Sequence, residues 1–174
     1  MHAPINPRVV PGCWGPPITL REFVPHDCQM IFRQIDRELA GKKKTRDIPQ
    51  LDFFEFRRLV KFAATPSEQK ELRLGIWHES WVGTIALKLP SPAEGELSYW
   101  IGSEFRNQGY ATSATITLVR YAFDVLKLPK IIAHVLHANL GSQKVLGRAG
   151  FHVEAPGAGW YTCAIKKPAE IPAK

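Results

Sequence analysis

The feature that most constrains this chain is an ordered change of residue pattern between positions 96 and 136. Residues 96–101 alternate between apolar and polar types, as a strand does, and a glycine-containing turn follows at 106–111. From 112 to about 127 the apolar residues recur with the period of a helix, and 130–136 is a short apolar run. Such a strand–helix–strand unit predicts two parallel strands joined by a right-handed crossover.

The turn at 106–111 is expected to bind an anion. The first turn of a helix has backbone N–H groups without intrahelical partners and a partial positive charge. Gly109 would let a ligand approach the backbone. A tight turn in which Gly109 needs positive φ is the alternative, because the glycine patterns of dinucleotide-binding and phosphate-binding loops are absent from the sequence.

The rest of the chain predicts one domain of mixed α/β type. The other expected elements are an edge-like strand at 18–23, helices at 28–39 and 51–64, a hairpin of strands at 71–77 and 81–87, a helix at 140–149 capped by Asn139, and a closing hairpin at 151–153 and 160–165. We expect a flexible proline-rich arm at 1–17, the folded domain at 18–166 and a tail at 167–174. The cluster Lys42 to Arg46 is either a solvated connector or a contact for phosphate or an acidic substrate.

The net charge and the cysteine content indicate which partners and which cellular compartment to expect. The net charge of +7 favours anionic partners, and three widely spaced cysteines without a Cys-x-x-Cys pair or an apolar leader favour a reducing cytoplasm. No apolar run is long enough for a membrane span. We therefore expect no membrane partner, and an RNA-binding function lacks any RNA-recognition fingerprint.

Three stretches resemble the GNAT superfamily of N-acetyltransferases. Arg106, Gly109 and Ala111 fit its Gln/Arg-x-x-Gly-x-Gly/Ala motif, and 96–102 resembles its strand ending in Tyr-Trp-Ile. The helix opened by Asn139-Leu140-Gly141-Ser142 and closed by Gly150-Phe151 resembles its Asn-x-x-Ser helix. The resemblance spans about 18–166.

The opening of the domain resembles one branch of that superfamily. Leu20-Arg21-Glu22-Phe23 followed by Asp27 is similar to the Leu-Arg-x-Phe and Asp of the Rim-type enzymes that acetylate ribosomal-protein N-termini. The resemblance implies a single GNAT-like domain with a mixed, mostly antiparallel sheet of six to seven strands, about four flanking helices, and a parallel, splayed strand pair at the cofactor site.

The function that this resemblance implies is transfer of an acetyl group from acetyl-CoA to a primary amine by direct attack on the thioester. A protein or peptide N-terminal α-amine is the preferred acceptor. A small amine, such as an antibiotic or a metabolite, and a non-catalytic coenzyme A-binding module stay open as alternatives. A polycationic acceptor is disfavoured by the net positive charge. No metal is expected, and a homodimer is left open.

The resemblance also assigns site residues. The cofactor would be bound by Trp100, Ile101, Arg106, Gln108, Gly109, Tyr110, Ala111, Thr112, Asn139 and Ser142. The ring of Tyr110 is better explained by packing than by acid chemistry. Acceptor binding is assigned to Phe53, Tyr99 and Trp160, from the first two helices, the sheet and the closing hairpin.

Catalysis requires a neutral amine and a group that stabilises the leaving thiolate. An α-amine with a pKa near 8 is roughly a tenth neutral at pH 7, so a weak base suffices. Glu96 is the first candidate base, with His134 and His137 as alternatives, although each could be structural or solvent-facing. Leu146 stands where many relatives have a tyrosine acid, so Ser142 is the candidate donor to the thiolate unless it is an ordinary helix serine.

Overall fold

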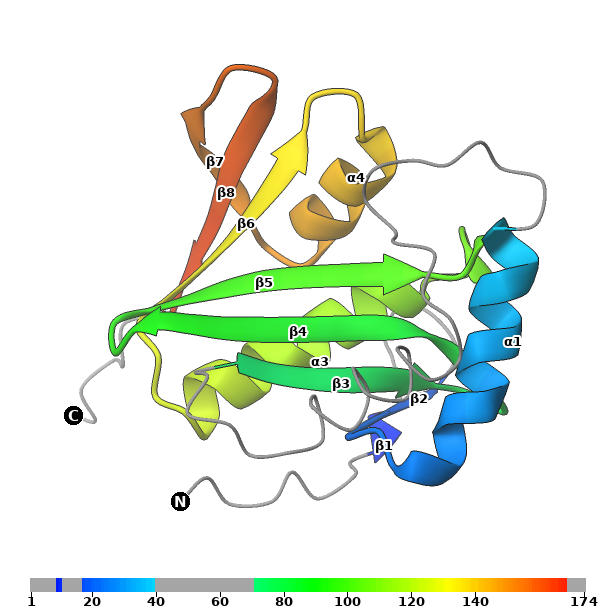
Figure 1. Cartoon of the computed structure of the whole chain (residues 1–174). Coiled ribbons are helices and arrows are strands. Elements are labelled where there is room, and N and C mark those ends of the chain that lie inside the picture. Colours follow the sequence, from blue (N-terminus) through cyan, green and yellow to red (C-terminus); the bar gives the residue numbers. More distant parts are fainter. Residues whose placement is uncertain (1–8, 11–16, 40–70, 169–174) are drawn as a thin grey trace.

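The computed structural model describes residues 9–10, 17–39 and 71–168, and within them one sheet runs through the domain (Figure 1). The strands are β1 Val9–Val10, β2 Ile18–Arg21, β3 Glu71–Trp77, β4 Trp81–Ser91, β5 Glu94–Ile101, β6 Lys130–Leu136, β7 His152–Pro156 and β8 Trp160–Lys166, in the order β1-β2-β3-β4-β5-β6-β8-β7. The α-helices are α1 Cys28–Leu39, α3 Tyr110–Asp124 and α4 Leu140–Arg148, and short 3₁₀ turns lie at η1 Pro25–Asp27 and η2 Ser103–Phe105.

The mixed, mostly antiparallel sheet is confirmed, and so is the parallel pair of strands around α3. Eight strands are described where six to seven were expected, because Val9–Val10 pairs antiparallel with β2. That pairing also makes the edge position predicted for β2 wrong. The helix predicted at 51–64, the Lys42 to Arg46 cluster and most of the arm lie outside the described residues. No described helix has the length and apolar content needed to cross a membrane.

The sheet forks between its two parallel strands. β5 and β6 are paired at Gly95 with Ile131 and at Glu96 with Ile132, and beyond these pairs the strands diverge (Figure 1). β6 continues into antiparallel pairing with β8 along its whole length. The C-terminal half of β5 therefore has strand β4 on one side and an open flank on the other.

Successive side chains of β5 point to opposite faces of the sheet, and the two faces have different covers. Leu97 and Ile101 belong to the main apolar core, which includes Leu118 of α3 and Leu146 of α4. Trp100 points the other way and stacks on Trp81, with ring centroids 5.5 Å apart, in a smaller cluster that α1 covers. Helices α3 and α4 thus cover one face, and α1 covers the other.

An ion pair ties the end of β2 to the start of α1. The Arg21 guanidinium donates to both carboxylate oxygens of Asp27, at 2.7 and 2.9 Å, and lies over the Trp77 ring at 3.7 Å. The Val24 N–H donates to the same carboxylate at 2.9 Å. Burial by itself raises the pKa of Asp27, but the hydrogen bonds from Arg21 and Val24 outweigh it and hold that pKa below its usual value.

We expect Asp27→Asn to lower the free energy of unfolding by about 2 kcal/mol at pH 7, because a buried, bidentate, charge-assisted pair loses its anion. The folded pKa is depressed, so the carboxylate stabilises the fold fully above its unfolded pKa near 3.9. The stabilisation is lost as pH falls through the lower folded pKa. Urea unfolding of both proteins at several pH values would measure this. The same change at exposed Asp124 is the control and should cost under about 0.5 kcal/mol.

Candidate active site

A cavity of about 550 Å³ lies between the C-terminal half of β5, the start of α3 and helix α4. It is lined by residues 99–101, 105–107 and 109–112, by Asn139, and by residues 141, 142, 144, 145 and 148 of α4. The cavity is on the α3 and α4 side of the sheet. Most residues assigned to the cofactor from the sequence are therefore brought together around one space.

The N-terminus of α3 opens into this cavity without a side-chain cap. Its N-cap residue is Gly109, with φ of 87°, and the Ser113 N–H donates to the Gly109 carbonyl as the first helical bond, at 3.0 Å. The N–H groups of residues 110–112 thus have no carbonyl one turn back to donate to. Asn107 is also left-handed, with φ of 62°, which gives the turn a concave backbone. An anion placed there would meet several N–H donors and the positive end of the helix dipole.

The charged side chains among the described residues that line the cavity are all positive. Among the described residues that line it, Arg106, Lys144 and Arg148 are cationic and none is a carboxylate. The Arg106 Nε donates to the Ile101 carbonyl at 3.2 Å, which anchors this guanidinium at the end of β5. Sequence reasoning missed the role of Lys144 and Arg148, although basic residues four apart on one helix face are a recognisable signal.

Tyr99 and Ser142 meet at the wall of the cavity. The Tyr99 hydroxyl lies 2.5 Å from Ser142 Oγ and 3.3 Å from the Ser142 carbonyl oxygen. The Ser142 N–H donates to Asn139 Oδ1 at 3.0 Å, so Asn139 caps α4 as its position predicts. Burial raises the pKa of Tyr99, and the hydrogen bond with Ser142 offsets part of that rise. At neutral pH the phenol is therefore protonated.

Two of the assigned residues serve packing or turn geometry. The Gln108 side chain donates to the Glu104 carbonyl at 2.9 Å and is outside the described cavity lining. The Tyr110 ring is buried between His78 and Phe105, at centroid distances of 5.5 and 6.3 Å, so only its backbone is suited to an anion. Leu146, which stands where the resemblance to the superfamily implies a tyrosine acid, is 2% exposed and belongs to the core.

Glu96 lies at the fork of the sheet, on the face opposite to Tyr99. It is paired with Lys88 of β4 and with Ile132 of β6 and does not belong to the described cavity lining. A carboxylate there is next to the point where the strands separate. Glu96 and the Tyr99–Ser142 pair thus stand on the two sides of β5.

The aromatic residue assigned from the closing hairpin shares the face of Glu96. Trp160 is 44% exposed and stacks on His134 of β6, with ring centroids 5.0 Å apart. His134 Nδ1 is 3.2 Å from the Thr162 hydroxyl, and His137 Nε2 is 2.9 Å from the Trp160 carbonyl. None of these residues lines the described cavity. Phe53, the remaining assigned acceptor residue, lies outside the described part of the chain.

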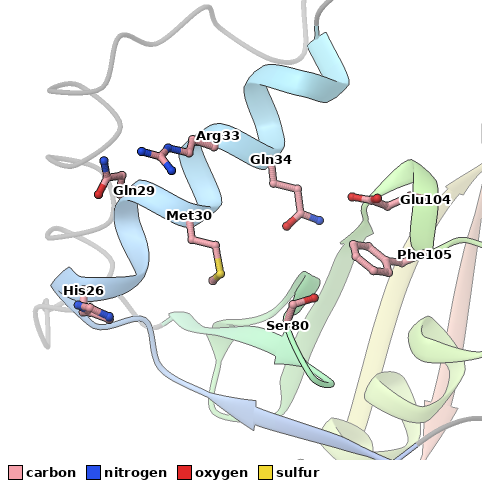
Figure 2. A pocket seen from close by; sticks show the side chains of 8 residues that line it. All are labelled: His26, Gln29, Met30, Arg33, Gln34, Ser80, Glu104 and Phe105. Carbon is pink, nitrogen blue, oxygen red and sulfur yellow. The ribbon is translucent and has the colours of Figure 1, made fainter.

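A second cavity, of about 510 Å³, lies on the α1 side of the molecule (Figure 2). Its lining consists of His26, Gln29, Met30, Arg33 and Gln34 with Ser80, Glu104 and Phe105. Figure 2 shows α1 on one side of this space and the turn carrying Glu104 and Phe105 on the other. Phe105 borders both cavities, so the two spaces are neighbours at the end of β5.

Residues 18–152 match the acetyltransferase (GNAT) domain family, which is most of the chain. The protein therefore belongs to this family. The fold expected from the sequence motifs and the family resemblance are both confirmed by this match and by the forked sheet.

Individual relatives agree with the family and extend the fold comparison. The chain is 33% identical over 104 residues to "Probable N-acetyltransferase YjcK" and 36% identical over 58 residues to "Putative ribosomal N-acetyltransferase YdaF", both of Bacillus subtilis. These matches cover 56% and 33% of this chain but 58% and 32% of the relatives, so the chain spans less than two thirds of either.

A solved structure with the same fold is that of Mycobacterium smegmatis RimJ in complex with CoA-disulfide. Its TM-score to this chain is 0.74 at 20% identity, over 90% of this chain and 85% of RimJ. At that identity the likeness shows the fold alone.

Proposed function

We propose that this protein is an acyltransferase that moves the acetyl group of acetyl-CoA to the α-amine of a protein or peptide N-terminus. The observation that carries the proposal is the uncapped N-terminus of α3, which opens into a cavity lined by three cations and, among its described residues, no carboxylate. The pyrophosphate of coenzyme A fits such a site, because it is a compact dianion with many acceptor oxygens.

The proposed position of the pyrophosphate also determines where the pantetheine arm and the nucleotide end of coenzyme A would lie. With the pyrophosphate on the N–H groups of residues 110–112, the pantetheine arm would run along residues 99–101 of the cavity wall, and its sulfur end would approach Ser142, which lines the same cavity. Lys144 and Arg148 are one helical turn apart on α4 and line the same space. They are placed to attract the phosphates of the nucleotide end.

We expect the double variant Lys144→Ala/Arg148→Ala to raise the KM for acetyl-CoA about tenfold at low ionic strength, while kcat changes less than about twofold. The reason is that both side chains are exposed and act on phosphates far from the reacting carbon. The difference should shrink as salt screens the charges. Steady-state kinetics at two salt concentrations measure it. Arg120→Ala, an exposed cation outside the described cavity lining, is the control and should leave KM unchanged.

The amine is proposed to arrive from the opposite face of the sheet. Glu96 lies at the fork on that face, and His134 with Trp160 lies further along the splayed strands. An α-amine needs only a weak base, which Glu96 supplies directly or through water. The thiolate then leaves on the Ser142 side. Base and leaving group are thus kept apart by β5.

The acceptor class is supported by two observations. One relative named above is described as "Putative ribosomal N-acetyltransferase YdaF". The net charge of +7 disfavours long-range attraction of polyamines and aminoglycosides, whereas a peptide brings one α-ammonium on a chain of either charge.

An acceptor screen with detection of released thiol tests the function. Peptides with free N-termini and varied first residues are expected to release coenzyme A and to gain one acetyl group by mass spectrometry. The same peptides blocked at the N-terminus but containing lysine should be inert. Acetylation of spermidine or an aminoglycoside with all peptides inert would overturn the acceptor class. Binding of acetyl-CoA with no acceptor-dependent thiol release would favour a coenzyme A-binding module instead.

A further inference from the structure

The contact between Tyr99 and Ser142 joins strand β5 to helix α4 at the wall of the cavity. The Tyr99 hydroxyl is 2.5 Å from Ser142 Oγ, and both residues line the cavity. Ser142 is held at a second point, because its N–H donates to Asn139 Oδ1 at 3.0 Å. Helix α4 itself carries no phenol, since its sequence is Leu-Gly-Ser-Gln-Lys-Val-Leu-Gly-Arg. The phenol beside this serine therefore enters from the sheet.

The direction of this hydrogen bond decides what Ser142 can do. Each hydroxyl has one proton to donate. If Ser142 donated to Tyr99, its only proton would be used and could not reach a ligand. A phenol is a stronger acid than an aliphatic alcohol, so the stronger bond is the one in which Tyr99 donates to Ser142 Oγ. In that arrangement the serine proton is free to turn into the cavity.

We propose, on the basis of the proposed function, that Tyr99 is a positioning residue that donates to Ser142 Oγ and thereby aims the serine O–H at the sulfur of the departing coenzyme A. As the amine nitrogen attacks the acetyl carbon, a C–N bond forms and the C–S bond breaks, which leaves the electron pair on sulfur. The serine O–H stabilises this thiolate by a hydrogen bond. The proton lost by the amine passes to Glu96, directly or through water, and from there to solvent, and solvent protonates the thiolate.

The burial of Tyr99 agrees with a positioning role. Because burial raises the pKa of the phenol, Tyr99 keeps its proton at and above neutral pH and stays a hydrogen-bond donor. It is thus a fixed donor to Ser142 and not the source of the proton that sulfur finally receives. The hydrogen-bond chain from phenol to serine to thiolate strengthens as charge develops on sulfur.

A double-mutant cycle with full kinetics tests this role. Tyr99→Phe removes one oxygen and is expected to lower kcat about tenfold, with the KM for acetyl-CoA changed less than about twofold. Ser142→Ala should lower kcat by at least as much. The double variant should match Ser142→Ala alone, because Tyr99 acts only through Ser142. Tyr121→Phe, which removes a phenol outside the described cavity lining, is the matched control and should leave kcat unchanged.

Failure of the positioning role and failure of the proposed function, on which it rests, would give different results. Losses that multiply in the double variant, or a Tyr99→Phe effect confined to KM, would overturn the positioning role and make Tyr99 an independent binding residue. A Ser142→Ala protein as fast as the wild type would also overturn it, while acetyl transfer by the wild type would keep the proposed function intact. A wild-type protein that releases no thiol with any acceptor would refute the function itself.

Discussion

Replacing Gly109 by valine is expected to abolish acetyl-CoA binding while the domain stays folded. Gly109 has φ of 87°, where a β-branched residue is strongly disfavoured, so the turn must move to accommodate valine. That movement displaces the N–H groups of residues 110–112, which are proposed to hold the pyrophosphate. Loss of two charge-assisted hydrogen bonds corresponds to an affinity loss of about 100-fold or more, measurable by calorimetry.

The control for this prediction is another glycine whose φ is also strongly positive. Gly159, in the turn between β7 and β8, has φ of 100° and no atom within 4 Å of where a Cβ would stand. Gly159→Val should cost a similar strain of about 1–2 kcal/mol in stability but leave acetyl-CoA affinity unchanged. Wild-type affinity in Gly109→Val would refute the proposed seat of the pyrophosphate.

The second large effect is expected from Ser142→Ala. With its hydroxyl gone, no serine O–H stabilises the thiolate, and kcat should fall about 10- to 30-fold while the KM for acetyl-CoA changes little. We expect kcat to fall without a change in KM, because the serine acts on negative charge that develops on sulfur only as the C–S bond breaks. Steady-state rates with a peptide acceptor, measured from pH 6 to 9, give both constants.

A serine away from the cavity serves as the comparison. Ser91 is at the end of β4, and its hydroxyl accepts from the Ala93 N–H at 3.3 Å, so Ser91→Ala removes a hydroxyl of similar exposure without touching the site. It should keep the wild-type kcat. If Ser142→Ala retains full turnover across this pH range, the serine is an ordinary helix residue and the thiolate needs another partner.

Much of the fold was predictable because its signals are local. Alternation and helical period identified the strand, helix and strand from 96 to 136, and their parallel pairing is confirmed at Gly95 with Ile131. The position of Asn139 predicted the start of α4, where it accepts from the Ser142 N–H. The pairing of Val9–Val10 with β2 was missed, since two residues give no periodicity to detect.

Much of the site could not be predicted from the sequence, because its residues are far apart in the chain and meet only in the folded structure. The cofactor motif brought Arg106, Gly109 and Asn139 into one prediction, and all three line the cavity. Lys144 and Arg148 were missed, because their cationic role depends on which face of α4 turns toward the turn after β5. From the sequence, Tyr99 was assigned to acceptor binding and Ser142 to cofactor binding and catalysis. Their contact in the folded structure was not predicted.

The sequence alone determined the order of the elements, the glycine turn at a helix N-terminus and the family to which the chain belongs. Each of these depends on patterns among residues that are close together in the chain. Only the tertiary structure decided that Tyr99 of β5 reaches Ser142 of α4 at 2.5 Å, and that Glu96 faces the other side of the sheet. The physical reason is that β5 and β6 part after two pairs, and α4 packs against the core on one face only. Contacts across that fork join residues 43 positions apart, which no local pattern specifies.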